Sequence, residues 1–214
     1  MNEGRLKECE ALLKNYPQLS GCMDDIHGAY RLMKDVCLRG GVIMTCGNGG
    51  SAADAEHIVG ELMKSFKIRR PITAEQKAAI VSMFPSDGDY LADNLQRGIP
   101  SISLVSQMSL NTAFINDVAP DMAFAQQVYV YGIEGDLLLG ISTSGNSRNV
   151  INACKIARTF GIRTIAMTGE NGGLLGDLCD VAICVPSTET FRVQEYHLPI
   201  YHALCAMLEV ELFS

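Results

Sequence analysis

The stretch VIMTCGNGGSAADAEHIVGEL, residues 42–62, determines the fold that we expect. Its first five residues (42–46) are mostly apolar and predict a buried strand, and a glycine-rich loop (47–51) follows directly. A helix is then predicted from about residue 52 to residue 65. Glycines at such a strand-to-helix junction let the backbone approach a ligand closely.

The same order of elements returns in GDLLLGISTSGNSRNVINA, residues 135–153. Alternating strands and helices predict a parallel sheet that is covered on both faces. We therefore expect an α/β fold, a doubly wound parallel sheet flanked by helices in a flavodoxin-like three-layer sandwich, with ligands beyond the carboxyl ends of the strands. The pattern predicts strands at 42–46, 101–105, 136–141, 163–167 and 181–185, and helices at about 2–15, 20–38, 52–65, 148–160 and 190–212.

The segment 67–98 interrupts this alternation. It begins with basic residues, has a helical middle (73–83) and then turns polar through 85–89. About 30 residues are too few to bury a core of their own. We expect a single domain over 1–214, with a helical N-terminal segment (1–40) and an insertion at about 67–98.

Composition narrows the class of protein. The formal net charge is −7, hydrophobic residues make up 48% and charged residues 19% of the chain, and the eight cysteines form no CxxC pair. These values favour a globular protein with reduced thiols, and they disfavour nucleic acid as a partner. The polar first ten residues do not resemble a secretory signal, and no apolar run is long enough for a bilayer. We expect a cytoplasmic protein with no membrane association.

Two loops have the composition of anion sites. Glycine-rich loop 47–51 opens a helix whose N-terminus carries unpaired N–H groups and a partial positive charge. Loop 142–147 places four hydroxyls at a second strand-to-helix junction and contains no lysine. Hydroxyls and amides of this kind suit a phosphate that is held but not cleaved. The alternative is an ordinary glycine turn and ordinary helix caps.

Acid–base side chains occur on two predicted helices. His57 and Glu61 are four residues apart and so share a helix face, and Gln194 and His202 are eight apart on the last helix. Spacing alone leaves the first pair open to interpretation as a surface or capping pair. His202 is equally open to interpretation as a buried core histidine.

A family resemblance favours the functional interpretation. Residues 46–62, residues 135–153 and the run RVQEYHLPIYHALCAMLE (192–209) closely resemble three characteristic stretches of bacterial phosphoheptose isomerases, which have the sugar isomerase (SIS) fold. The run 114–117, Phe-Ile-Asn-Asp, resembles a fourth. The resemblance covers nearly the whole chain except 67–98.

The resemblance implies an aldose–ketose isomerase that converts sedoheptulose 7-phosphate to D-glycero-D-manno-heptose 7-phosphate through an enediol, as a homotetramer. It implies that Glu61 and His202 are the catalytic pair. A carboxylate and an imidazole suit proton transfer beside a carbonyl near neutral pH. We assign the carbon-bound proton to Glu61, and ring opening or oxygen-bound protons to His202. The resemblance also implies that zinc is bound by His57, Glu61, Gln194 and His202, although a carboxylate bound to zinc is a poorer base than a free one.

The substrate contacts that the resemblance implies share two loops, one short helix and the last helix. They are Asn48, Gly49, Gly50, Ser51, Glu61, Asn116, Asp117, Ser142, Thr143, Ser144, Ser147 and Gln194.

The sequence is also compatible with two non-enzymatic classes of SIS-fold protein. The SIS fold includes a non-enzymatic tetrameric regulator of replication initiation and modules that only sense sugar phosphates. The presence of both Glu61 and His202 favours an enzyme, and the chain shows no helix-turn-helix segment. The insertion at 67–98 either reshapes the pocket, which would favour another sugar phosphate, or decorates a subunit interface.

Overall fold

The protein is built around one parallel sheet. The structure, a computed structural model, describes residues 3–214. Five strands lie in the order β2-β1-β3-β4-β5, and every neighbouring pair is parallel. The strands are β1 (Ile43–Gly47), β2 (Ser101–Ser103), β3 (Leu137–Ile141), β4 (Arg163–Thr168) and β5 (Val181–Cys184). The predicted doubly wound α/β fold is confirmed.

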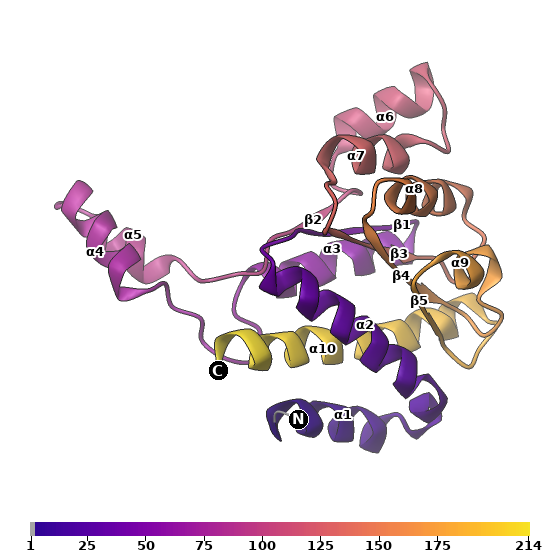
Figure 1. Cartoon of the computed structure of the whole chain (residues 1–214), viewed down its shortest axis with the longest axis horizontal. Helices are drawn as coiled ribbons and strands as arrows, with labels where there is room; N and C mark the ends of the chain where they lie inside the picture. The colour runs from indigo at the N-terminus through magenta and orange to yellow at the C-terminus, as the bar shows by residue number, and fades with distance from the viewer. Residues whose placement is uncertain (1–2) are drawn as a thin grey trace.

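Helices cover both faces of the sheet (Figure 1). The alternating side chains of β3 divide between two cores: Leu137, Leu139 and Ile141 face one, and Leu138 faces the other. The first core contains α1 (Glu3–Asn15), α2 (Met23–Leu38), α3 (Gly50–Met63) and α10 (Thr190–Phe213), together with the 3-10 turn η1 (Pro17–Cys22). The second contains α7 (Ala123–Tyr131), α8 (Arg148–Thr159) and α9 (Gly173–Leu178). The result is the three-layer sandwich expected from the sequence.

The sequence pattern missed several short helices. α5 (Gly88–Asn94), α6 (Met108–Asp117), α7 and α9 were not predicted, and β2 is shorter than the expected 101–105. The polar run 85–89 was expected to leave the helical state, yet α5 begins within it. These helices have six to ten residues, too few for a clear hydrophobic period. Within residues 3–214, no helix has the length and apolar character needed to cross a membrane.

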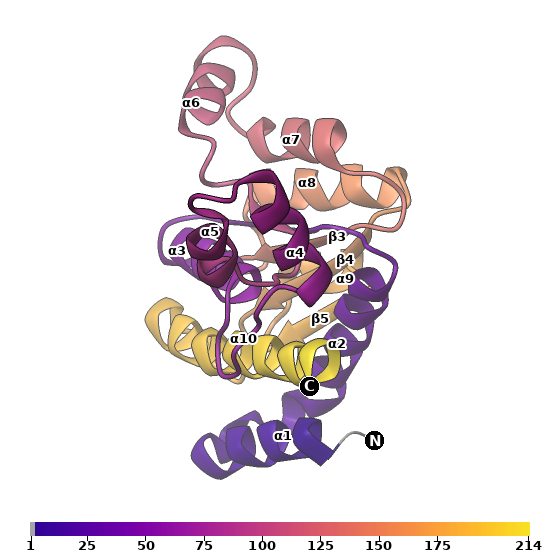
Figure 2. The same cartoon turned by 90° about the vertical axis from the view of Figure 1, so that its left-hand side faces the viewer.

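Residues 67–98 form an arm that extends away from the sheet (Figure 1) and points toward the viewer in Figure 2. Its two helices, α4 (Ala74–Met83) and α5, contact each other, and Thr73 caps α4 through a capping box with Gln76. Lys77 joins the two helices through an ion pair of 2.5 Å to Asp93. α4 has no buried residue, as expected of a segment too short for its own core. The single-domain interpretation of 1–214 stays a prediction, and residues 1 and 2 lie outside the described part.

A buried ion pair holds the base of the arm. Arg70 and Glu209 are both fully buried, and the Arg70 Nε atom lies 2.7 Å from Glu209 Oε1. The same carboxylate accepts hydrogen bonds from the backbone N–H groups of Phe66, Lys67 and Ile68, at 2.7 to 3.1 Å. Burial alone would raise the pKa of Glu209, but these N–H groups and the guanidinium lower it on balance.

The guanidinium also closes the end of α3. Arg70 Nη1 donates to the carbonyl of Leu62 at 2.9 Å, and Nη2 donates to the carbonyl of Glu61 at 3.4 Å. Carbonyls in the last turn of a helix have no partner within the helix, so a buried helix end needs such donors. One ion pair therefore connects the arm, the end of α3 and the last turns of α10.

We predict that Glu209→Gln lowers the free energy of unfolding by about 3–5 kcal/mol, because it leaves a buried guanidinium without its counter-charge. Glu195→Gln, on the same helix, removes only an exposed pair with Arg192 and should cost at most about 1 kcal/mol. Chemical denaturation of both variants measures the difference.

The lowered pKa of Glu209 also fixes a pH dependence. Its contribution to stability is complete above the unfolded-state pKa, near the ordinary glutamate value of 4.5, and is lost as the pH falls through the lower folded-state pKa. Glu209→Gln should therefore flatten the acid limb of stability against pH. An equal cost for Glu209→Gln and Glu195→Gln would contradict this role.

Candidate active site

The first part of the site lies where the strand order reverses, between β1 and β3. In this sheet order the chain leaves the two strands in opposite directions and opens a crevice at their carboxyl ends. The amides of Asn48, after β1, and Asn149, at the start of α8, exchange two hydrogen bonds of 2.9 Å across it. A cavity of about 200 Å³ lies beside them, lined among others by Gly49 and Asn111.

Loop 142–147 follows directly after β3, at the carboxyl end of that strand. Ser142 is buried, and its hydroxyl lies 2.9 Å from the hydroxyl of Ser147, so these two mainly shape the loop. Ser144 is exposed and accepts a hydrogen bond from the N–H of Asn146 at 3.2 Å. The hydroxyl of Thr143 has no hydrogen bond within residues 3–214 and can donate to a ligand. α8 begins at Arg148, so its free N–H groups point toward this loop.

The second part of the site is a cluster between α3 and α10. His57 Nε2 lies 3.2 Å from Glu61 Oε1 on the same face of α3, as their spacing predicts. The ring of His202, on α10, meets the ring of His57 edge-on, with 5.0 Å between centroids. Lys64 Nζ lies 3.3 Å from the other carboxylate oxygen of Glu61. The structure thus brings both members of the predicted catalytic pair to one place.

The surroundings of His202 favour its neutral form. Burial lowers its pKa, the neighbouring His57 lowers it further, and Glu61 opposes the shift. Its Nε2 atom is buried and has no hydrogen-bond partner in the part of the chain that is described. A buried nitrogen without a partner costs free energy, which is typical of a group that meets a ligand. By contrast His197, which the sequence left without a role, is fully buried against the carbonyl of Thr168, and burial lowers its pKa to about 4.

A metal fits this cluster only in part. Imidazole nitrogens and a carboxylate are ligands that zinc takes, and His57, Glu61 and His202 supply them. Gln194, however, lies at the other end of α3, where its amide covers Gly50. Among residues 3–214, no three His, Cys, Asp or Glu side chains lie close enough together to hold a metal ion. A single chain therefore does not gather the expected four-ligand zinc site.

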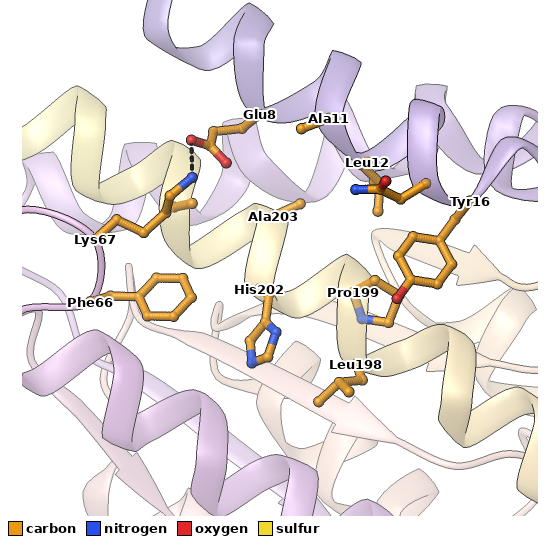
Figure 3. Close-up of a pocket in the computed structure, with 12 residues that line it drawn as sticks. Glu8, Ala11, Leu12, Tyr16, Phe66, Lys67, Leu198, Pro199, His202 and Ala203 are labelled. Atoms are coloured by element: carbon orange, nitrogen blue, oxygen red, sulfur yellow. Dashed lines mark hydrogen bonds and ion pairs between the residues drawn. The ribbon is translucent and has the colours of Figure 1, made fainter.

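A larger cavity, of about 370 Å³, lies on the other side of α10, between this helix and α1 (Figure 3). His202 and Phe66 contribute to its lining, and an ion pair of 2.5 Å between Glu8 and Lys67 spans it. The rest of the lining is mostly apolar and includes Tyr16. Its lining contains no serine or threonine and no helix N-terminus. Loop 142–147 and the starts of α3 and α8 supply both at the carboxyl ends of β1 and β3, so this end of the sheet is the better phosphate site.

The expected Asn-Asp element lies at the edge of the crevice, where its Ile115 lines the cavity of about 200 Å³. Asn116 and Asp117 are exposed on α6 and hydrogen-bond to each other at 2.7 Å. The sequence pattern also missed Asn149, although its position in the first turn after the hydroxyl loop is a signal that the sequence carries. It missed Asp54 and Tyr201 as well, which hydrogen-bond beside His57.

Comparison with known proteins identifies the family. A model of the SIS domain matches residues 10–83 and 88–169. The phosphoheptose isomerase of Aliarcobacter butzleri is 39% identical over 189 residues, which cover 88% of this chain and 86% of that one. The structure of the Neisseria gonorrhoeae phosphoheptose isomerase superposes with a TM-score of 0.71 at 31% identity, covering 96% of this chain and 92% of that one. The chain belongs to the phosphoheptose isomerase family.

As a member of this SIS-domain family the protein is a sugar-phosphate isomerase. The phosphoheptose isomerase of Akkermansia muciniphila is 33% identical over 214 residues and matches over the whole of both chains. That match includes 67–98, and the SIS model also covers most of this segment. The arm is therefore compatible with membership of the phosphoheptose isomerases, although the resemblance seen in the sequence left it out.

The hydroxyl loop yields a stability prediction. Gly145 has φ +66°, and a Cβ atom there would lie 1.9 Å from the carbonyl oxygen of Gly172. Gly145→Ala must therefore displace one of two packed loops, and we expect it to lower the free energy of unfolding by at least about 1–3 kcal/mol. Gly176→Ala is the control, since nothing lies within 4 Å of its Cβ position. Equal melting temperatures for the two variants would show that the loops are not packed in this way.

Proposed function

We propose that this chain converts sedoheptulose 7-phosphate to D-glycero-D-manno-heptose 7-phosphate by acid–base proton transfer through an enediol. The observation that carries the proposal is the cluster in which His57 contacts Glu61 on its own helix and the ring of His202 on the facing helix. A carboxylate with a neutral imidazole beside it is the set that aldose–ketose isomerisation needs. The names of the relatives support the seven-carbon substrate.

In the proposed mechanism the two loops hold the phosphate. Thr143 and Ser144 donate hydroxyl hydrogen bonds, and the free amides at the starts of α3 and α8 add partial positive charge. Asn48, Gly49, Gly50 and Ser51 form the facing loop. Because no cation enters either loop in the sequence, the phosphate is bound without being activated as a leaving group.

Proton transfer is assigned to the cluster. Glu61 removes a proton from C1 of the open-chain ketose, exchanges it with solvent and delivers a proton to C2, which gives the aldose. His202, neutral because burial lowers its pKa, moves the proton between the two oxygens of the enediol. Asn116, Asp117 and Gln194 are proposed to contact the sugar.

We also propose zinc as the metal, with His57, Glu61, Gln194 and His202 as its ligands. When bound, zinc would stabilise negative charge on the substrate oxygens as a Lewis acid. The donor chemistry of three of the four side chains supports this proposal, and the position of Gln194 in a single chain does not.

The separation of the two parts of the site supports a shared site in a homotetramer. Glu61 lies eleven residues after Gly50, about 16 Å along α3 at 1.5 Å per residue. From C1 to the phosphorus atom the substrate has eight bonds of about 1.5 Å each, a contour of about 12 Å. A second copy that brings its own loop or cluster closer would complete the site.

Eight free cysteines are consistent with a cytoplasmic enzyme.

The assignment of the catalytic pair is tested by assaying purified protein with sedoheptulose 7-phosphate and a panel of other ketose and aldose phosphates, with and without zinc. Glu61→Gln and His202→Ala should each lower kcat/KM by about 10²-fold or more. Glu56→Gln, an exposed carboxylate on the same helix that contacts Ser106, is the matched control and should retain activity. If the wild type turns over none of these sugar phosphates, the proposed function is wrong.

The shared site is tested by mixing two inactive variants. Glu61→Gln impairs the cluster, and Ser144→Glu places a negative charge in the hydroxyl loop. If one site takes its loop and its cluster from different copies, mixed oligomers contain some intact sites and should recover part of the wild-type rate. Each variant alone should stay inactive. Light scattering gives the subunit number, and a monomer, or mixtures without recovered activity, would contradict a shared site.

A further inference from the structure

The arm at 67–98 carries an apolar groove that the proposed function does not use. The groove lies on a face that α4 and α5 share and has a volume of about 350 Å³. Its lining comes from both helices and consists of Ile80, Phe84, Tyr90, Leu91, Asn94 and Leu95. Five of these six side chains are large and apolar, so the groove suits an apolar surface.

The side chains of the groove are open to water. Tyr90 is 72% exposed, Leu95 51%, Phe84 48% and Leu91 38%. A fully exposed side chain of this size offers about 200 Å², so these four together expose about 400 Å². A contiguous apolar patch of a few hundred Å² is typical of an interaction site.

The two helices of the arm are too short to be stable by themselves. α4 has ten residues and α5 seven, and a helix below about 12–15 residues is marginal in water unless one of its faces is buried. α4 has no buried residue within this chain. A molecule that covers the groove would supply the burial that the two helices lack.

The base of the arm is fixed, so the groove projects in a defined direction. The N–H of Arg97 donates to the carbonyl of Arg70 at 2.7 Å, and Arg97 Nε donates to the carbonyl of Pro71 at 3.1 Å. These bonds tie the two limbs of the arm together. The guanidinium of Arg97 also lies 5.2 Å from the ring centroid of Phe213, at the end of α10. The groove is thereby held away from the sheet, where it can meet another molecule (Figure 1).

The charges around the groove are compatible with a second copy of this chain. Each copy has a formal net charge of −7, which opposes contact between unpaired acidic surfaces. None of the six lining residues is charged. The acidic side chains of α5, Asp89 and Asp93, pair with Lys77 of α4 at 3.4 and 2.5 Å. Two copies can therefore meet at the groove without like charges facing each other.

The area of the groove also suits a symmetric pair of copies. A surface that covers about 400 Å² contributes a similar area of its own, so one contact removes about 800 Å² from water. A two-fold pair repeats every contact. Two such contacts bury about 1,600 Å², which is the standard size of a stable protein interface.

We propose that the groove of the arm is a self-association surface, through which the arm of each copy holds a second copy of this chain. This assigns 67–98 to a contact between subunits and not to the pocket, the two roles that the sequence left open. The inference goes beyond the proposed homotetramer, because it names a surface that joins the copies. It does not depend on the roles of Glu61 and His202 or on a bound metal.

A charge placed in the groove tests this contact. Tyr90→Glu changes a side chain that is mostly exposed in the single chain, so the variant should fold as the wild type does, which circular dichroism checks. In the oligomer it buries an unpaired carboxylate. It should raise the concentration at which the oligomer dissociates by at least about 30-fold, the scale of one lost aromatic anchor. Analytical ultracentrifugation measures this concentration.

Ser82→Glu is the matched control. Ser82 is exposed on α4 and does not line the groove, and it lies about 200° around the helix from Ile80. The same charge at this position should leave the dissociation of the oligomer unchanged.

Cross-linking identifies what covers the groove. A photo-reactive phenylalanine analogue replaces Tyr90, and ¹⁵N-labelled chains are mixed with unlabelled chains at a concentration where subunits exchange. After the mixture is concentrated and irradiated, mass spectrometry should find cross-linked peptides that join a labelled chain to an unlabelled one. The same analogue at position 82 should give few of them.

The outcomes separate this inference from the proposed function. A wild type that stays monomeric, an oligomer that Tyr90→Glu leaves intact, or cross-links within single chains only would overturn the arm contact. A monomer that binds phosphatidylcholine vesicles through Tyr90 would overturn it too and would assign the groove to a lipid surface. Dissociation by Tyr90→Glu but not by Ser82→Glu, in a protein that turns over no sugar phosphate, would remove the proposed function and keep the arm contact.

Discussion

The buried ion pair between Arg70 and Glu209 is the constraint on which the other features of the site depend. It takes two opposite charges fully out of water, which is unfavourable unless each charge is also hydrogen-bonded. Three backbone N–H groups satisfy the carboxylate, and two carbonyls at the end of α3 satisfy the guanidinium. Because these hydrogen bonds must all form at the same time, they fix the position of the end of α3 relative to α10.

That position sets the register of two helices that run parallel to each other. Gln194 lies against Gly50 at their starts, Tyr201 bonds to Asp54 and His57 at mid-length, and Glu209 binds the segment after α3. The Glu61 cluster lies between the second and third of these contacts, so its geometry is fixed from both sides. The arm at 67–98 leaves the body at this anchor, and it can vary without disturbing the cluster because its helices pack mainly on each other.

The sequence predicted the sheet and the two loops because these depend on local patterns. Apolar runs of five residues before glycine or serine loops mark buried strands, and the four-residue spacing of His57 and Glu61 alone places them on one helix face. The sequence could not predict which residues meet from distant elements. The reciprocal amide hydrogen bonds of Asn48 and Asn149 join residues about one hundred positions apart in the sequence. The hydrogen bond from the Tyr201 hydroxyl to Asp54 joins residues almost one hundred and fifty positions apart.

The separation of Gln194 from His202 illustrates the same limit. A helical projection puts the two residues on one broad face, but it omits the rise along the axis, about 12 Å for eight residues. The helix contacts at each level decide what each residue meets: Gly50 for Gln194, and His57 for His202. The family resemblance implies one zinc site that contains both Gln194 and His202. Within a single chain these two residues lie far apart along α10.

We propose that Glu61 carries the proton transfer between C1 and C2 of the substrate in this sugar-phosphate isomerase. Turnover of sedoheptulose 7-phosphate in D₂O, followed by proton NMR and mass spectrometry, tests it most directly. We expect the wild type to form an aldose phosphate with solvent deuterium at C2, and Glu61→Gln to form none. Ketose recovered unchanged, with no deuterium at C1 and no aldose, or undiminished turnover by Glu61→Gln, would contradict it.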